Sequence, residues 1–247
     1  MNGLLVLPVA VAGTVLGSFT ATAAIRYARG EGFLGGRSHC DECGATLGFA
    51  ATVPLASYVG FGGAARCCRG RIDPLHPAGE LAGLVIALAA AAPGDLTRDL
   101  LVAGVGFCLL ALTLIDLRTS RLPDPLVAAT AVGGLLLSAL AGVERLLAGV
   151  VAAGTAFLIL EALRRAFLRF RGRGGLGGGD VKLLAALGLW LGAMTPLALA
   201  LAALLGLLQV TVLRPKDGRI AFGPALAFAG FAAGLAKEFA PTLWGLG

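Results

Sequence analysis

Long runs of apolar residues alternate with short polar segments along the whole chain. A helix needs about 20 apolar residues to cross the hydrocarbon core of a bilayer. The uncharged stretch 183–213 is too long for one helix, and Pro196 breaks it, because proline disfavours a helical residue before it. We therefore expect an all-α, polytopic membrane helix bundle of about eight transmembrane helices. The expected spans lie near residues 4–25, 78–94, 99–116, 125–143, 145–163, 180–194, 196–213 and 220–240.

Charged residues are scarce, and they lie between the apolar runs. Only 14% of the residues are charged, whereas a soluble domain carries about 25%. A net charge of +6 would suggest a nucleic-acid partner in a soluble protein. Here the basic residues occupy the loops, so we expect membrane lipid around the chain and no nucleic acid.

The loops differ in how many basic residues they hold. One alternating set holds 17 of the 20 lysines and arginines, and the other holds only Arg98, Arg145 and Lys237. Because Lys and Arg accumulate in cytoplasmic loops, we expect a multi-pass protein of the cell (inner, cytoplasmic) membrane with both termini outside the cytoplasm. Arg26 and Arg29 follow the first run, and no basic residue precedes it, which predicts a retained helix rather than a signal peptide.

Residues 26–77 form a long polar segment between the first two expected spans. It contains four of the five cysteines and both histidines. This composition predicts a small cytoplasmic insert, which a zinc ion is suited to brace. A structural disulfide is disfavoured because the cytoplasm is reducing.

Two aspartates converge on one side of the membrane. The third expected helix ends at Asp116 and the sixth starts at Asp180, and both of these ends face the cytoplasm. Ionisable groups at such positions are costly and are candidates for function. Two facing carboxylates suit aspartic peptidase chemistry without a metal, because one removes a proton from water while the other donates a proton to the scissile carbonyl. Such a pair titrates as a unit, so neither role is assigned to one residue.

A glycine-rich segment, 174–179, precedes Asp180. Glycines such as Gly177 and Gly179 adopt backbone conformations that other residues resist, and they allow a peptide to approach closely. The alternative interpretation is a flexible loop that ends in Asp180 as a helix N-cap. A phosphate-binding loop is disfavoured, because no strand precedes the glycines and no Lys-Ser/Thr pair closes them.

Six segments, taken together, resemble motifs of the type 4 prepilin peptidases. They occur in order along the chain, and their order is more specific than any one of them. One departure is that Thr20-Ala21 replaces the Asn-Val of the first motif. The segments are Gly17-Ser18-Phe19 with Arg26, the cysteine pair within 37–43, Ile72-Asp73-Pro74 followed by Pro77 and Glu80, the first aspartate motif 114–124 ending in Leu-Pro-Asp, the Gly-x-Gly-Asp-x-Lys motif at 177–182, and Ala221-Phe222-Gly223-Pro224.

The resemblance implies an aspartic endopeptidase that cleaves the leader peptide of type IV prepilin-like precursors on the cytoplasmic side. It implies Asp116 and Asp180 as the catalytic pair, with no cofactor for the peptidase activity. The peptidase membrane domain would span 95–247 and follow an N-terminal region, 1–94. It also implies a second activity, N-methylation of the new N-terminus with S-adenosylmethionine, although the sequence contains no nucleotide-binding fingerprint.

Further candidates for substrate binding are Lys182 and Glu80, together with Gly177 and Gly179. Lys182 lies two residues after Asp180. It either holds that carboxylate ionised, contacts the substrate, or extends to the cytoplasm as an interfacial lysine. Glu80 either binds a substrate amine or pairs with an arginine.

Asp124 competes with Asp116 for the first catalytic role. Asp124 precedes Pro125, and an aspartate N-cap with proline at the first helical position is a sufficient structural explanation for it. Asp116 closes an apolar helix without any such explanation, so we favour Asp116.

The cysteines depart from the family's pattern of two Cys-x-x-Cys pairs. Cys40 and Cys43 supply the first pair, but Ala65 stands where the third cysteine is expected, and Cys67 lies directly before Cys68. Adjacent cysteines bind one zinc ion only with an unusual local backbone. Three alternatives therefore stay open: a structural zinc site formed by the four cysteines, a zinc site completed by His39 or His76, and the loss of the site.

The competing class is a non-enzymatic transporter or channel that uses intramembrane carboxylates. The two aspartates lie at the membrane edge rather than at its midplane, and no repeat symmetry accompanies them, which favours the peptidase. A peptidase of the same type that cleaves other membrane peptides is a third interpretation.

Overall fold

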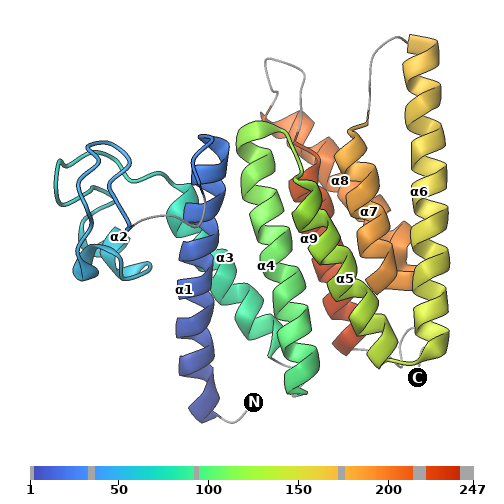
Figure 1. The fold of residues 1–247 in the computed structure, drawn as a ribbon, viewed down its shortest axis with the longest axis horizontal. Helices are drawn as coiled ribbons and strands as arrows, with labels where there is room; N and C mark the ends of the chain where they lie inside the picture. Colours follow the sequence, from blue (N-terminus) through green and yellow to red (C-terminus); the bar gives the residue numbers. More distant parts are fainter. Residues whose placement is uncertain (1–2, 33–36, 92–94, 172–175, 214–220, 240–247) are drawn as a thin grey trace. The chain divides into compact units, whose positions relative to one another are not determined.

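The computed structural model describes residues 3–32, 37–91, 95–171, 176–213 and 221–239. The described part is helical, with two isolated β-bridges and no strand, which confirms the predicted all-α class. The chain separates into two compact units, unit 1 (Met1–Gly94) and unit 2 (Asp95–Gly247). Unit 1 contains α1 (Gly3–Ala28), the 3₁₀ turn η1 (Phe49–Ala51), α2 (Ala56–Gly60) and α3 (Leu75–Ala90) (Figure 1). Unit 2 contains α4 (Leu96–Thr119), α5 (Asp124–Leu140), α6 (Val143–Arg171), α7 (Gly178–Leu191), the 3₁₀ turn η2 (Gly192–Met194), α8 (Thr195–Leu213) and α9 (Gly223–Phe239).

Each expected span coincides with one helix, α1 or one of α3 to α9. The helices α3 and α5 are apolar but shorter than a typical span. The count of eight crossings stays a prediction, and residues 92–94, 220 and 240 of the expected spans lie outside the described residues. Four described stretches are long and apolar enough to cross a membrane: Leu5–Ala28, Leu96–Thr119, Val143–Phe170 and Gly178–Val212, the last of which runs from α7 into α8.

Glycines form the contact between α1 and α3 in unit 1. Gly13 and Gly17 are one turn apart on α1, and Gly79 and Gly83 are one turn apart on α3. A Cβ atom added to Gly13 would lie 2.7 Å from the carbonyl oxygen of Gly83, and one added to Gly17 would overlap the carbonyl oxygen of Gly79. Small residues at this spacing let two helices approach backbone to backbone, which favours helix association in a membrane. We call these four glycines the glycine seam.

In unit 2, α7 packs against α5, α6, α8 and α9. This central place explains why most of its side chains after Asp180 are buried, although the helix has only 14 residues. Glycines again permit close approach. A Cβ atom on Gly134 of α5 would lie 3.1 Å from the backbone nitrogen of Trp190, and one on Gly188 of α7 would lie 2.9 Å from the Cα atom of Ala153. These close contacts hold the C-terminal end of α7 against α5 and α6.

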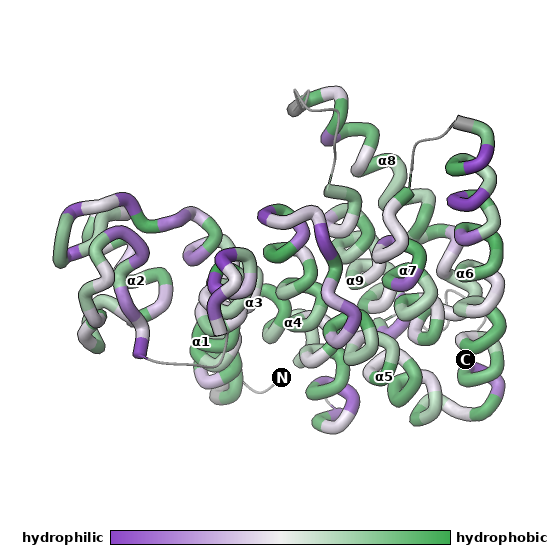
Figure 2. The backbone as a smooth tube through the Cα atoms, turned by 45° about the horizontal axis from the view of Figure 1, so that its top comes forward, coloured by the Kyte–Doolittle hydropathy of each residue, from purple (hydrophilic) through white to green (hydrophobic). Residues whose placement is uncertain are grey.

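The three basic residues of the charge-poor loops belong to one polar cluster in unit 2. Lys237 of α9 donates a hydrogen bond of 2.5 Å to the carbonyl oxygen of Trp190, and Glu238 accepts a bond of 3.1 Å from the Trp190 indole. Arg98 of α4 forms an ion pair with Glu238, and Arg145 is close enough to Lys237 to interact electrostatically. Lys237 and Arg98 are therefore held by protein contacts, while apolar residues dominate most of the helices (Figure 2).

Candidate active site

Asp116 lies in the last turn of α4, where the helix ends at Ser120 in a left-handed conformation (φ 51°). Asp116 is only 6% exposed. The Oδ2 atom of Asp116 accepts a hydrogen bond of 3.1 Å from the backbone amide of Gly223, at the start of α9. A Cβ atom on Gly223 would lie 2.6 Å from the same oxygen, so this position requires glycine.

Asp180 lies in the first turn of α7, and its side chain is half-buried. The helix N-cap is Gly177, so the interpretation of Asp180 as an N-cap is wrong. A Cβ atom on Gly177 would lie 2.7 Å from Oδ2 of Asp180. The carboxylate therefore folds back over Gly177, whose missing side chain leaves room for it.

The two carboxylates occupy the same end of unit 2. Asp116 and Asp180 are close enough to interact electrostatically. Leu122, in the connection between α4 and α5, packs against the glycines beside both of them: its Cβ atom would lie 3.0 Å from a Cβ atom on Gly179, and its Cδ2 atom 3.1 Å from one on Gly223. Because like charges repel, ionisation of one carboxylate disfavours ionisation of the other. Two carboxylates at one end of a helix bundle are the groups that an aspartic peptidase uses to activate a water molecule.

The predicted role of Asp124 as an N-cap is wrong. The N-cap of α5 is Pro123, and Asp124 is the first helical residue. Its side chain instead accepts a hydrogen bond of 2.8 Å from Nζ of Lys182. This ion pair is exposed, at 50% for Lys182 and 70% for Asp124. Sequence patterns miss it because the two residues meet only when α7 packs beside α5.

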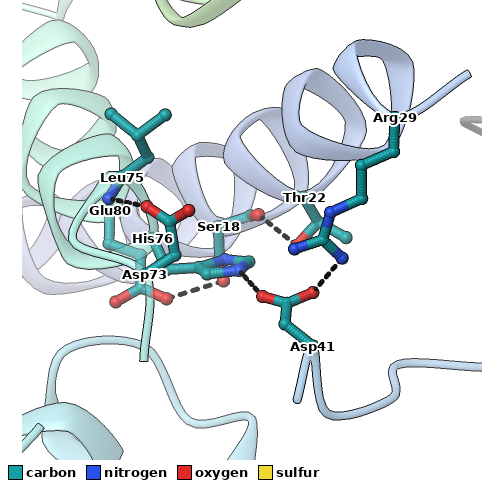
Figure 3. Close-up of polar contacts among 8 residues, drawn as sticks. All are labelled: Ser18, Thr22, Arg29, Asp41, Asp73, Leu75, His76 and Glu80. Carbon is teal, nitrogen blue, oxygen red and sulfur yellow. Dashed lines mark hydrogen bonds and ion pairs between the residues drawn. The ribbon is translucent and has the colours of Figure 1, made fainter. Parts of the chain in front are cut away.

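Glu80 belongs to unit 1 and is 7% exposed. It accepts hydrogen bonds of 2.7 Å from the hydroxyl of Ser18 on α1 and 2.8 Å from the backbone amide of Leu55. Figure 3 shows the carboxylate between α1 and α3, beside the ion pair of His76 with Asp41. The hydrogen bond to His76 lowers the pKa of Asp41 to about 2, with a further contribution from Arg29.

The four cysteines of the insert converge. The sulfurs of Cys40, Cys43, Cys67 and Cys68 all lie within 4.8 Å of one another. A tetrahedral zinc ion with bonds of about 2.3 Å to each sulfur spans such a group. The backbone amide of Cys43 lowers the pKa of Cys40 to about 7, while the neighbouring thiols raise the pKa of Cys67 to about 12. The two thiols therefore favour opposite protonation states. A divalent cation would hold both of them as thiolates, because it binds the deprotonated sulfur. The donor set therefore fits zinc.

The backbone explains how adjacent cysteines reach one point. Two turns repeat one hydrogen-bond pattern. In the first, Cys40 and Ala45 pair through a bond of 2.8 Å inside the bridge between His39 and Thr46. In the second, residues 64–71 repeat this pattern: Ala65 occupies the place of Cys40, and its amide donates a bond of 2.8 Å to the carbonyl of Gly70. Cys67 projects its sulfur into the cluster and so stands in for the cysteine that is missing at position 65.

Comparison with known proteins gives consistent matches. A profile described as "Type IV leader peptidase family" matches residues 102–211, and one described as "Bacterial Peptidase A24 N-terminal domain" matches residues 11–93. A prepilin leader peptidase/N-methyltransferase from Aeromonas hydrophila is 37% identical over 218 residues, which cover 85% of this chain and 72% of the relative. A protein of the same name from Burkholderia pseudomallei (strain K96243) is 37% identical, over 84% of this chain and 67% of the relative. Another from Neisseria gonorrhoeae is 32% identical, over 78% of this chain and 69% of the relative. No solved structure gives a significant match.

Proposed function

The chain belongs to the type IV leader peptidase family, and from this we propose that it is an aspartic endopeptidase that removes the leader peptide from type IV prepilin-like precursors on the cytoplasmic side of the inner membrane. The observation that carries the proposal is the pairing of two carboxylates, Asp116 and Asp180, at one end of unit 2. The relatives' name, which includes prepilin leader peptidase, supplies the substrate class.

The proposed mechanism uses the carboxylates as an acid–base pair. The ionised carboxylate takes a proton from a water molecule, whose oxygen attacks the scissile carbonyl carbon. The protonated carboxyl donates its proton to the carbonyl oxygen. The tetrahedral centre then collapses as the first carboxyl gives the proton taken from water to the nitrogen, the carbon–nitrogen bond breaks, and a hydroxyl proton returns to the second carboxylate. The amide of Gly223 and the gap above Gly177 hold the two side chains in place for these transfers.

The proposed cytoplasmic location of cleavage follows from the distribution of basic residues. Reporter fusions at Gly62 and Ser120 should report the cytoplasm, and a fusion at Glu144 should report the outside. The helix α4 ends at Ser120 and α6 begins near Glu144, so the fusions at Ser120 and Glu144 report on opposite ends of the helices of unit 2. A cytoplasmic signal from Glu144 would contradict the proposed topology.

A second proposed activity is N-methylation of the new amino terminus with S-adenosylmethionine, because the relatives' name also includes N-methyltransferase. The four-cysteine cluster would hold a zinc ion that braces the insert. Four sulfur ligands leave no open position for water, so this ion would have a structural role.

The test is incubation of the purified full-length protein with a prepilin-like precursor, followed by mass measurement of the product's N-terminus. Asp116→Asn and Asp180→Asn should each abolish cleavage and leave the thermal unfolding temperature unchanged. Full activity in either folded variant would overturn the proposal. Sensitivity to a chelator combined with an active Asp180→Asn variant would identify a metallopeptidase instead.

A further inference from the structure

The connection between α4 and α5 carries a half-buried leucine, Leu122, beside the aspartate pair. It belongs to the Leu-Pro-Asp end of the first aspartate motif, and the proposed acid–base chemistry gives it no role. The end of α4 and the starts of α7 and α9 lie at the same end of unit 2 (Figure 1). Leu122 is therefore placed where it can contact the segments that hold both carboxylates.

The backbone of Leu122 is constrained on both sides. Ser120 ends α4 in a left-handed conformation (φ 51°), and its amide donates a hydrogen bond of 2.8 Å to the carbonyl oxygen of Asp116. Pro123 follows Leu122, and a proline restricts the residue before it to an extended backbone. The carbonyl oxygen of Pro123 accepts a bond of 3.2 Å from the amide of Val127 in α5. The side chain of Leu122 therefore projects from a short connection that is anchored at both ends.

The two methyl groups of Leu122 lie beside two different helix starts. Its Cδ1 atom would lie 3.2 Å from a Cβ atom on Gly179, at the start of α7, and its Cδ2 atom would lie 3.1 Å from a Cβ atom on Gly223, at the start of α9. Gly179 directly precedes Asp180, and the amide of Gly223 donates the hydrogen bond to Asp116. Each arm of the side chain therefore meets the backbone that places one of the carboxylates.

We propose that Leu122 is a positioning residue of the aspartate pair: its forked side chain sets the separation of the two carboxylates by keeping the starts of α7 and α9 apart. This rests on the proposed peptidase function. Leucine branches at Cγ, and its staggered rotamers hold the two methyl groups in defined directions. Because residues 179 and 223 are glycines, the methyl groups approach the backbone itself, and no flexible side chain lies between them that could yield.

The separation matters because the proposed reaction uses one ionised and one protonated carboxyl group. Repulsion between two carboxylates grows as they approach, and it disfavours the doubly ionised pair. Carboxyl groups that lie too far apart ionise independently and no longer reach the same water molecule and peptide carbonyl. An apolar spacer fixes this distance without adding a charge or a hydrogen bond to the site. The nearby charges of Asp124 and Lys182 are paired with each other.

The test is the kinetics of precursor cleavage by variants of the purified full-length protein. Leu122→Ile keeps the volume and apolar character of the side chain but moves its branch to Cβ, and such volume-conserving changes are usually tolerated by the fold. We expect kcat to fall about tenfold or more with little change in KM. Leu146→Ile is the matched control, because Leu146 is also half-buried and lies at the start of α6. It should cleave at the original rate.

Leu122→Ala removes both methyl groups and should broaden the pH range of cleavage. The starts of α7 and α9 can then approach each other, and stronger repulsion keeps the pair singly protonated over a wider range of pH. A residue with only a structural role would change the amount of folded protein and leave this range as it was. Leu122→Met, which is apolar but not forked, replaces Leu122→Ile if that variant does not fold, and it should lower kcat in the same way.

The original kcat in folded Leu122→Ile, or an unchanged or narrower pH range in folded Leu122→Ala, would overturn the positioning role. Asp116→Asn and Asp180→Asn are measured alongside. Inactive aspartate variants combined with normal Leu122 variants would reject the role of Leu122 alone. Cleavage by a folded aspartate variant would reject the peptidase proposal, whatever the Leu122 variants do.

Discussion

The backbone amide of Gly223 donates a hydrogen bond of 3.1 Å to Oδ2 of Asp116. These residues are far apart in sequence, and they meet because α9 begins where α4 ends. The bond leaves Oδ1 of Asp116 as the oxygen available for other partners. The start of α9 is therefore a positioning element for one carboxylate of the proposed pair.

Gly223→Ala should reduce cleavage strongly. Its methyl group would lie 2.6 Å from Oδ2 of Asp116, and a displacement of about 1 Å at a reacting group costs about a hundredfold in rate. The measurement is kcat for a precursor peptide. Gly104→Ala on α4 is the control, because nothing lies within 4 Å of the added atom. Equal rates for the two variants would contradict a positioning role for Gly223.

Lys182→Met and Asp124→Asn separate substrate binding from the ion pair that joins these residues. The pair is exposed, so its loss should change the free energy of unfolding by less than about 1 kcal/mol. If Lys182 contacts the substrate, which is one of the roles expected for it, Lys182→Met should raise KM with little change in kcat, whereas Asp124→Asn should leave both near their original values. Inactive Asp124→Asn protein that still folds would instead place Asp124 in the proposed catalytic pair.

Cys67→Ser should lower the zinc content of the purified protein, because Cys67 provides the fourth sulfur of the cluster. Ala65→Cys combined with Cys67→Ser should restore it, because Ala65 occupies the position equivalent to Cys40 in the second turn. Metal analysis should give about one equivalent of zinc for the unmodified protein and for the double variant. Cys108→Ser, on α4 and outside the cluster, is the control. A double variant as poor in zinc as Cys67→Ser would refute the equivalence.

Glu238→Gln should destabilise unit 2 by about 2 kcal/mol or more, because it leaves Arg98 without its buried anionic partner. Glu238 is 4% exposed in its side chain and also holds the indole of Trp190. Thermal unfolding in detergent measures the effect. Glu144→Gln removes an exposed carboxylate of α6 and should have no comparable effect. The remaining folded Glu238→Gln protein should cleave normally, since the cluster and Asp116 occupy opposite ends of α4.

Hydropathy was sufficient to predict the helices, because a bilayer requires long apolar segments whatever their packing. It was also sufficient to expect Asp116 and Asp180 at helix ends that face the same side of the membrane. The contacts that position these side chains depend on packing between distant segments, so the amide of Gly223 and the pairing of Asp124 with Lys182 could not be derived from the sequence. The spacing of Gly13 with Gly17 and of Gly79 with Gly83 was a visible signal for a helix contact that sequence reasoning did not use.

The adjacent cysteines show a different limit of prediction from the sequence, which concerns the spacing of metal ligands. A spacing rule treats Cys67 and Cys68 as a broken pair, because it assumes that the ligands occupy fixed positions in the turn. The described backbone keeps the turn and changes which residue supplies the sulfur. Spacing therefore underestimated the capacity of this segment to hold a metal.

The glycine seam between α1 and α3 fixes how far α1 can shift along α3, and so fixes the alignment of Ser18 with Glu80. Gly17 directly precedes Ser18 and Gly79 directly precedes Glu80, so the backbone contact at the seam sets how these two polar side chains line up. Sliding one helix along the other by one turn would move Ser18 about 5.4 Å, well beyond hydrogen-bond reach of Glu80. A methyl group added to a glycine of the seam would therefore disturb the alignment of Ser18 with Glu80 without contacting either side chain.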